Sequence, residues 1–346
     1  MKTKSVMLIR VSAALLFLFA AGASAQNVKI TPLGSHAGEL CGRDRATIFE
    51  DPTGVRILYD AGQSVTGGDD PRLGNIHVVL LSHAHGDHLG DSKMKALEAG
   101  TCAAPEFVSA APHSTTAEIA AAKGAALMMA GDMSVFVARK VQNILGKPTG
   151  ACAEVAGAIT VPTAAACAAP AFLGGMRLFK APGAAQGVEV TIVYASHGNN
   201  VSLSLVSEPQ RTQLAADNVS LTLGPPTGYV VKFSNGLTVY LTGDSGLHSE
   251  MKTIVNEFHK ANLVVLNLGL SAVTPQAAAY AMNELVKPAA VIVSHPNEAV
   301  TSGGKVRPLA RAATFVGLVK GRPVFMALSG KTMEFDGGAK CVTGCN

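Results

Sequence analysis

The sequence predicts an α+β fold, an αββα four-layer sandwich in which two mixed β-sheets pack face to face and helices cover the outside. Three observations lead to this prediction. Short β-branched runs bounded by turn residues open both halves of the chain, helical patterns follow in each half, and strands alternate with helices toward the C-terminus. Two such halves favour two packed sheets over one parallel sheet.

The first 25 residues are predicted to form a secretory signal peptide. Three basic residues precede an apolar run at 11–21, and small residues at 23–25 then precede Gln26, which is the order expected around a cleavage site after Ala25. The run is shorter than a membrane span, and no later segment is long and uninterruptedly apolar. We therefore expect a periplasmic or secreted mature chain, residues 26–346, without a membrane span. A retained N-terminal anchor is the alternative.

The charge of the mature chain is close to balanced. The predicted signal peptide takes three of the 28 Lys and Arg residues and none of the 24 Asp and Glu residues, which leaves 25 basic against 24 acidic residues. The basic residues are scattered and aromatic residues are few, so no nucleic-acid partner is expected. The length allows one large domain or two small ones, and we predict a single domain with a substantial core.

Six cysteines fit an oxidising compartment in which disulfides persist. They form no repeated C-x-x-C pair, which argues against a cysteine-based zinc site. The sequence leaves 15 pairings open, and free buried thiols are a further alternative. The favoured pairing is Cys341 with Cys345, Cys152 with Cys167, and Cys41 with Cys102.

Strands open the mature chain and helices follow them. The predicted strands are at 28–33, 46–50, 55–60 and 76–81. Thr115 and Glu118 resemble a capping box that opens a helix through about residue 130, and a second helix is expected at 134–145. From 146 to 187 the chain is rich in Ala, Gly and Pro, so we predict an irregular, disulfide-tied insertion at about 102–187.

The second half of the chain repeats this order. Asn235-Gly236 between two apolar runs is a strong hairpin signal. Thr274 and Pro275 predict the N-cap and the first turn of a helix. Strands are predicted at 188–195, 229–234, 237–241, 263–268, 290–294, 324–328 and 331–335. Helices are predicted at 247–260, 275–286 and 308–320.

The most informative run, S-H-A-H-G-D-H at residues 82–88, directly follows an apolar strand. By composition its H-x-H-x-D-H pattern would arise by chance with a probability on the order of a few in ten thousand. His83 and His85 are two residues apart at a strand end, so both imidazoles can reach one metal ion at about 2.0–2.1 Å. Gly86 allows a sharp turn that points Asp87 and His88 at a second position, as two-metal hydrolysis needs with ions about 3.5–4 Å apart.

Three further candidate ligands also follow apolar strands. His197, Asp244 and His295 each come within a few residues of a strand's end. If those strand ends lie on one edge of the core, the three side chains can converge on the residues of the first run. The sequence therefore predicts a site with two metal ions.

These seven residues and their order resemble the metallo-β-lactamase superfamily. The resemblance implies a first metal held by His83, His85 and His197, a second held by Asp87, His88 and His295, and Asp244 as the bridging carboxylate. It covers nearly the whole mature chain in order but does not account for the segment at about 102–187. Within the superfamily, residues 228–269 look most like the ascorbate-6-phosphate-lactonase-like branch.

The resemblance also narrows the reaction. Authentic β-lactamases generally lack a bridging aspartate at the position of Asp244, and flavodiiron relatives generally carry Glu where this chain has His85. We therefore predict a dinuclear metal-dependent hydrolase whose metal-bridging hydroxide attacks an ester-like bond of a small molecule, a lactone or phosphodiester before a β-lactam or thioester. A non-catalytic exported metal-binding module is the alternative from a different class.

Roles for individual residues follow from this prediction. Asp87 is the candidate catalytic residue that carries a proton to the leaving group. His36, in a loop after the first strand, is a candidate substrate contact, with an ordinary loop histidine as the alternative. Asp91 is a candidate hydrogen-bond partner of a ligand imidazole. The two cofactor ions are Zn²⁺ by default, because His and carboxylate ligands suit Zn²⁺, Mn²⁺ and Fe²⁺ alike.

Overall fold

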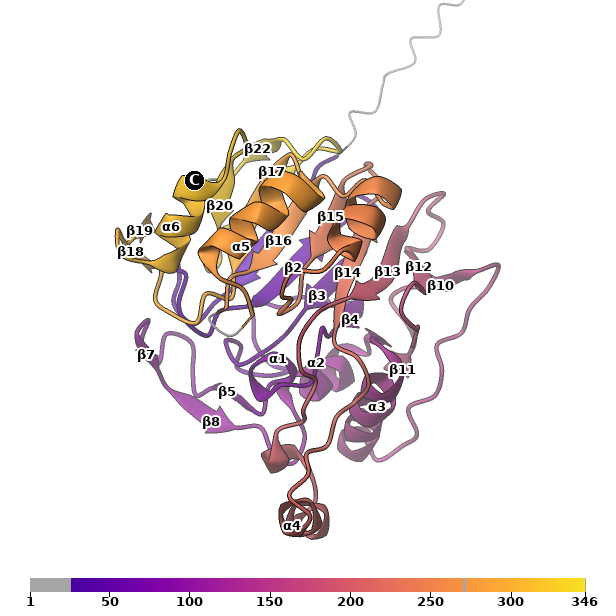
Figure 1. Ribbon diagram of the computed structural model, residues 1–346. Helices are drawn as coiled ribbons and strands as arrows, with labels where there is room; N and C mark the ends of the chain where they lie inside the picture. The colour runs from indigo at the N-terminus through magenta and orange to yellow at the C-terminus, as the bar shows by residue number, and fades with distance from the viewer. Residues whose placement is uncertain (1–25, 270–271, 346) are drawn as a thin grey trace, which may run out of the picture.

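The computed structural model describes residues 26–269 and 272–345, so the predicted signal peptide lies outside the described residues (Figure 1). The first large sheet comes mainly from the N-terminal half. Its strands are β1 (Val28–Leu33), β2 (Ala46–Glu50), β3 (Arg56–Tyr59), β4 (Val78–Leu80), β9 (Ala126–Met128), β11 (Cys167–Ala168), β21 (Met333–Phe335) and β22 (Cys341–Thr343). They lie in the order β11-β9-β4-β3-β2-β1-β21-β22, with antiparallel pairs around β1 and β2 and parallel pairs from β3 to β11.

The second large sheet comes from the rest of the chain. Its strands are β10 (Ala158–Thr160), β12 (Met176–Lys180), β13 (Val188–Tyr194), β14 (Thr227–Lys232), β15 (Thr238–Leu241), β16 (Leu263–Asn267), β17 (Ala290–Ser294) and β20 (Val324–Met326). They lie in this same order across the sheet. The strands from β15 to β20 pair in parallel. The two central ones, β16 and β17, are buried on both faces, which is why they consist of Val, Ile, Leu and Ala up to their last residue.

Helices cover the outer faces of the two sheets (Figure 1). On the first sheet lie α2 (Thr115–Lys123) and α3 (Gly131–Leu145), which pack on each other and on β4, β9 and β11. On the second lie α5 (Pro275–Tyr280), α6 (Arg311–Leu318) and the π-helical segments η2 (Met251–Phe258) and η3 (Ala281–Val286). The predicted αββα sandwich is confirmed.

Aromatic side chains join the two sheets across the core. Tyr59 of β3 meets Tyr229 of β14 edge to face, with ring centroids 6.3 Å apart, and Phe49 stacks on Phe233 at 6.0 Å. All four rings are buried. Each contributes roughly 1.5–3 kcal/mol by leaving water, so these contacts hold the sheets, and the residues at their edges, at a fixed distance.

One predicted helix is shorter in the structure than the sequence analysis expected. The helix expected from 115 to 130 ends at Lys123, because Gly124 adopts a left-handed backbone with φ of 62°, and residues 126–128 form the buried strand β9. Periodicity could not reveal this, since a run that is apolar on every face fits a buried strand as well as a buried helix. Ser114 caps the helix by accepting a hydrogen bond from the Ala117 N–H, so the predicted capping box at Thr115 is one residue late.

The segment at 102–187 is more ordered than the predicted insertion. It supplies β9 and β11 to the first sheet and β10 and β12 to the second, so it belongs to both layers of strands. Irregular chain remains between α3 and β12 around the disulfide Cys152–Cys167. The Ala-rich composition led to the prediction of an irregular insertion, but Ala fits a tightly packed strand as well as a loop.

The disulfides and most other elements agree with the sequence analysis. The six cysteines pair as predicted: Cys41–Cys102, Cys152–Cys167 and Cys341–Cys345. Thr274 caps α5 by accepting from the Ala277 N–H, and α5 with η3 spans the predicted 275–286. Among the described residues, no helix is long and apolar enough to cross a membrane.

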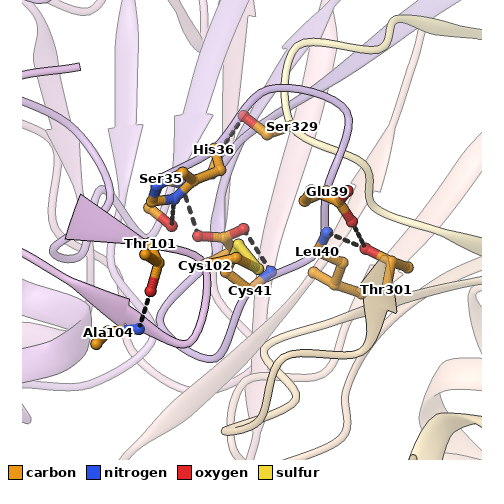
Figure 2. Close-up of a disulfide and its surroundings, with 12 residues drawn as sticks. Ser35, His36, Glu39, Leu40, Cys41, Thr101, Cys102, Ala104, Thr301 and Ser329 are labelled. Carbon is orange, nitrogen blue, oxygen red and sulfur yellow. Dashed lines mark hydrogen bonds between the residues drawn. A yellow bond between two sulfur atoms is a disulfide. The ribbon is translucent and has the colours of Figure 1, made fainter. Parts of the chain in front are cut away.

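The remaining elements are short. Three two-stranded sheets pair β5 (Ser92–Met94) with β8 (Phe107–Ser109), β6 (Gly100–Thr101) with β7 (Ala104–Pro105), and β18 (Thr301–Ser302) with β19 (Lys305–Val306). The short helical segments are the turns α1 (Gly86–Leu89) and η1 (Leu203–Leu205) and the nine-residue helix α4 (Glu208–Ala216). Figure 2 shows the Cys41–Cys102 disulfide, which fastens the β6–β7 hairpin to the loop after β1.

Candidate metal centre

The seven residues singled out by the sequence lie together at one edge of the sandwich, where strands of both sheets end. His83 and His85 follow β4, and Asp87 and His88 lie on α1. His197, Asp244 and His295 follow β13, β15 and β17 of the other sheet. Both sheets therefore contribute side chains to one site, and the packing between the sheets fixes the spacing.

Side-chain atoms of the seven residues form three overlapping groups, within each of which the possible ligand atoms lie within 4.8 Å of one another. The groups are His83 with His85 and His197; His83 with His88 and Asp244; and Asp87 with His88 and His295. The two outer groups are the two triads that the resemblance implies. The middle group shares His83 with one triad and His88 with the other, and adds Asp244 between them.

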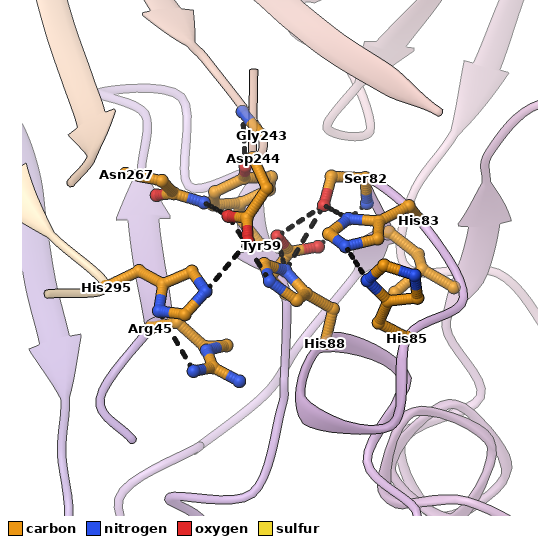
Figure 3. A network of polar contacts seen from close by, with 12 residues as sticks. Arg45, Tyr59, Ser82, His83, His85, His88, Gly243, Asp244, Asn267 and His295 are labelled. Atoms are coloured by element: carbon orange, nitrogen blue, oxygen red, sulfur yellow. Dashed lines mark hydrogen bonds and ion pairs between the residues drawn. The ribbon is translucent and has the colours of Figure 1, made fainter. Parts of the chain in front are cut away.

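The first outer group has the spacing of ligands on one ion. Nε2 of His83 lies 3.1 Å from Nδ1 of His85, and the ring of His197 has its centroid 5.0 Å from each of theirs. Nitrogens bound tetrahedrally at 2.0–2.1 Å would be about 3.4 Å apart, so this pair needs only a small shift to share an ion. Figure 3 shows His83 and His85 pointing toward each other.

Asp244 occupies the centre of the site and is nearly fully buried. Its Oδ2 lies 3.0 Å from Nε2 of His295 and 4.0 Å from Nε2 of His197, and its Oδ1 lies 3.4 Å from Nε2 of His88. Burial raises the pKa of this carboxyl, but His295 and His88 outweigh burial and hold it well below its ordinary value. A charged carboxylate between the two triads is the position expected of a bridging ligand. Asn267 donates to its Oδ1 at 3.0 Å (Figure 3).

Sequence reasoning missed Asp60, which orients His88. Its Oδ2 lies 2.7 Å from Nδ1 of His88 and accepts from the Ser82 hydroxyl at 2.7 Å, and all three residues are buried. Burial disfavours the charged form of His88, but Asp244 and Asp60 raise its pKa to about 10. Asp60 is the first residue after β3, at the same sheet edge as the motif, and that placement was the available signal.

His88 supplies a test of whether a cation fits. Its Nε2 is buried and makes no hydrogen bond with any residue that the structure describes, although Asp244 lies 3.4 Å away. Because Asp60 holds the hydrogen on Nδ1, Nε2 is the nitrogen directed into the cluster of other ligand atoms, and a bound cation would replace the second proton that the raised pKa keeps on it. An unpartnered buried nitrogen is costly, and a bound cation would satisfy it, so the residues fit a metal.

Arg45 is the second residue that sequence reasoning missed. Its buried guanidinium pairs with Oδ2 of Asp87 at 2.8 Å. It also donates to Nδ1 of His295 at 3.0 Å (Figure 3). Because a guanidinium can only donate, Nδ1 of His295 accepts, and the ring's hydrogen is on Nε2, facing Asp244. To bind a cation through Nε2, His295 would have to release that hydrogen to solvent as a proton, which the positive charge of Arg45 favours. No sequence pattern marked Arg45.

Two secondary predictions have different outcomes. Asp91 accepts from Gln63 and Ser92, so the carboxylate that contacts a candidate ligand imidazole is Asp60, and the prediction for Asp91 is wrong. The reason is its place past α1, where its carboxylate lies close against Gly86 and bonds Gln63 and Ser92. His36 lies 3.3 Å from the Gly100 carbonyl beside the β6–β7 hairpin, and its contact with substrate stays a prediction.

A cavity of about 620 Å³ opens beside the site and has Asp87 in its wall. The β6–β7 hairpin and residues 297–299 form much of its remaining lining, together with Arg43 and Phe107. The cavity combines charged, polar and apolar surface next to the candidate ligands. It is large enough for a small molecule.

Curated proteins similar to this chain are UPF0173 metal-dependent hydrolases. That of Polynucleobacter asymbioticus is 27% identical over 300 residues, covering 83% of this chain and 82% of the relative. That of Cupriavidus taiwanensis is 26% identical over 226 residues, covering 65% of this chain and 60% of the relative. No family model matches the chain.

A solved structure supports the fold. Igni18, a metallo hydrolase from Ignicoccus hospitalis, aligns with a TM-score of 0.54 and 21% identity over 90% of this chain and 99% of its own. The chain shares the fold of this metallo hydrolase, and its sequence relatives are metal-dependent hydrolases.

Proposed function

We propose that this chain is a metal-dependent hydrolase that uses two divalent cations to cleave an ester-like bond in a small molecule. The observation that carries the proposal is the convergence of three overlapping His and Asp groups at one sheet edge, beside a cavity. A lactone or a phosphodiester is the favoured substrate, because of the resemblance to the ascorbate-6-phosphate-lactonase-like branch.

In this proposal the seven residues divide between two cations. His83, His85 and His197 would hold the first, Asp87, His88 and His295 would hold the second, and Asp244 would contribute its carboxylate between them. When bound, such cations would lower the pKa of water toward about 7 and polarise the oxygen of the scissile bond. Zn²⁺ is the default, with Mn²⁺ and Fe²⁺ as alternatives.

The chain's own residues orient the reactants and move the proton. Asp87 is the candidate ligand in the cavity wall, and its side chain is 25% exposed. Burial raises its pKa, but Arg45 and the neighbouring histidines hold it well below its ordinary range. A carboxylate with a lowered pKa is a weak base, and its protonated form is a strong acid, so a proton that it receives passes readily to the leaving group.

The test combines metal analysis with a substrate screen. The mature chain is loaded with Zn²⁺ or Mn²⁺ and assayed on lactones, phosphodiesters, thioesters and a β-lactam, beside Asp87→Asn and the exposed control Asp132→Asn. We expect two ions per chain and turnover of a lactone or phosphodiester that Asp87→Asn reduces by about 10²–10⁴-fold and Asp132→Asn leaves unchanged. Two bound ions with no Asp87-dependent turnover would favour the non-catalytic binding module instead.

We also propose that the protein is exported. The basic and apolar order of residues 1–25 and the three disulfides of the remaining chain support this. N-terminal sequencing of protein from the periplasm or medium is expected to start at Gln26. Cytoplasmic protein with an intact Met1 would contradict it.

A further inference from the structure

Arg45 contacts two of the three residues proposed to hold the second cation. We propose that Arg45 is a positioning residue that keeps Asp87 and His295 at the spacing which that cation requires. The inference rests on the proposed function, because it concerns the affinity for one of the two ions. It assigns to Arg45 a role in metal binding without direct contact with the ion.

The contacts of the guanidinium fix two residues from different sheets. Nη1 pairs with Oδ2 of Asp87 at 2.8 Å and also donates to the Asp87 carbonyl oxygen, while Nη2 donates to Nδ1 of His295 at 3.0 Å. The guanidinium is planar and its donors diverge at fixed angles, so the two acceptors are held at one spacing. In this arrangement Nε2 of His295 lies 3.7 Å from Oδ2 of Asp87.

The backbone next to Arg45 also fixes the backbone of His295. The carbonyl of Asp44 accepts the N–H of His295 at 3.1 Å. His295 has a left-handed backbone, with φ of 44°, which a residue other than glycine keeps only where its surroundings fix it. Residues 44 and 45 thus secure both the backbone and the ring of this candidate ligand.

The Arg45 side chain fits in its place because residue 62 is a glycine. A Cβ at Gly62, whose φ is 56°, would lie 2.8 Å from Cγ of Arg45 and 2.7 Å from the Asp87 carbonyl oxygen. The Arg45 side chain itself is 0% exposed, whereas Asp87 reaches the cavity. Substrate cannot touch a group that is fully covered, so Arg45 acts through its two partners.

The experiment is a titration of the metal-free mature chain with Co²⁺ and with Zn²⁺, followed by calorimetry and by the visible spectrum of the Co²⁺ form. Arg45→Met is compared with Arg56→Met, because Arg56 also bonds one carboxylate and one carbonyl, at Glu50 and Leu73, away from the site. In Arg45→Met we expect the first ion to bind as in the wild type and the second to bind about 10–100-fold more weakly, with altered Co²⁺ bands. Arg56→Met should bind both ions normally.

Arg45→Lys separates spacing from charge and also covers a failure of Arg45→Met to fold. Lysine keeps the charge but has one ammonium that cannot reproduce the planar fork, so the second ion should stay at least about tenfold weaker. Three results would overturn this inference and leave the proposed function standing. They are wild-type affinity for both ions in the Arg45 variants, an equal loss of affinity at both positions, and full recovery of affinity in Arg45→Lys. A wild-type chain that binds fewer than two ions overturns the proposed two-ion function as well.

Discussion

Oδ2 of Asp60 lies 2.7 Å from Nδ1 of His88, so this buried carboxylate fixes which nitrogen of the imidazole faces the candidate metal centre. Asp60→Asn removes the negative charge. Where the amide nitrogen takes the place of Oδ2, it also removes the atom that accepts the hydrogen bond from Nδ1 of His88. Loss of such a partner typically costs about 10–100-fold in metal affinity, and we expect a loss of this size. Calorimetric titration with Zn²⁺ measures it, and Asp132→Asn is the control. Unchanged affinity would show that Asp60 does not orient His88.

Gly86 begins α1 at a point where a side chain does not fit. A Cβ there would lie 2.1 Å from Oδ2 of Asp91, which Gln63 holds in place through a 2.9 Å hydrogen bond. We expect Gly86→Ala to lower the free energy of unfolding by about 1–3 kcal/mol and to weaken metal binding, because Asp87 and His88 follow directly. Urea unfolding of the metal-free chain measures the first effect.

Gly317 is the matched control for that substitution. It lies within α6, and a Cβ there would meet nothing within 4 Å. Gly317→Ala should therefore raise the free energy of unfolding by about 0.5–1 kcal/mol, through the better helix propensity of alanine. A similar loss of stability in both alanine variants would contradict the crowding argument for Gly86.

The disulfides should differ in their contribution to stability. Cys41 and Cys102 are 61 residues apart and Cys152 and Cys167 are 15 apart. In the chain-entropy account the longer loop stabilises by about 4 kcal/mol and the shorter by about 3 kcal/mol. Urea unfolding of the two double Cys→Ala variants tests the order, with the wild type in reductant as a further comparison. The Cys41–Cys102 variant should also lose turnover, because its hairpin lines the cavity.

The buried carboxyl of Asp44 should make the free energy of unfolding depend on pH. Burial raises its pKa to about 6, against the lowering effect of the Cys41 and Ser35 N–H groups. The folded chain thus binds this proton more tightly than the unfolded chain, so the charged carboxyl costs stability above pH 6 and the cost disappears as the pH falls toward 4. The stability of the wild type relative to Asp44→Asn should increase by about 2 kcal/mol from pH 7 to pH 4. Chemical unfolding at both pH values measures this, and a difference that does not vary with pH would rule out the raised pKa.

Much of the fold could be predicted because it follows from local patterns. The ranges predicted for β1, β2 and β17 agree with the structure to the residue, since alternating or continuous apolar runs between turn residues have one common solution. The strand β9 could not be predicted. Its three residues are buried on every side, and only pairing with β4 and β11 distinguishes it from the end of a helix.

The candidate site divides in the same way. The sequence by itself determined which residues are available as ligands, because imidazoles and carboxylates at strand ends in the H-x-H-x-D-H spacing have few other uses. The tertiary structure decided what surrounds them. Asp60 and Arg45 are distant in sequence from His88 and His295, and their roles arise from burial, where an unpaired charge is costly and each polar atom must find a partner in the folded chain.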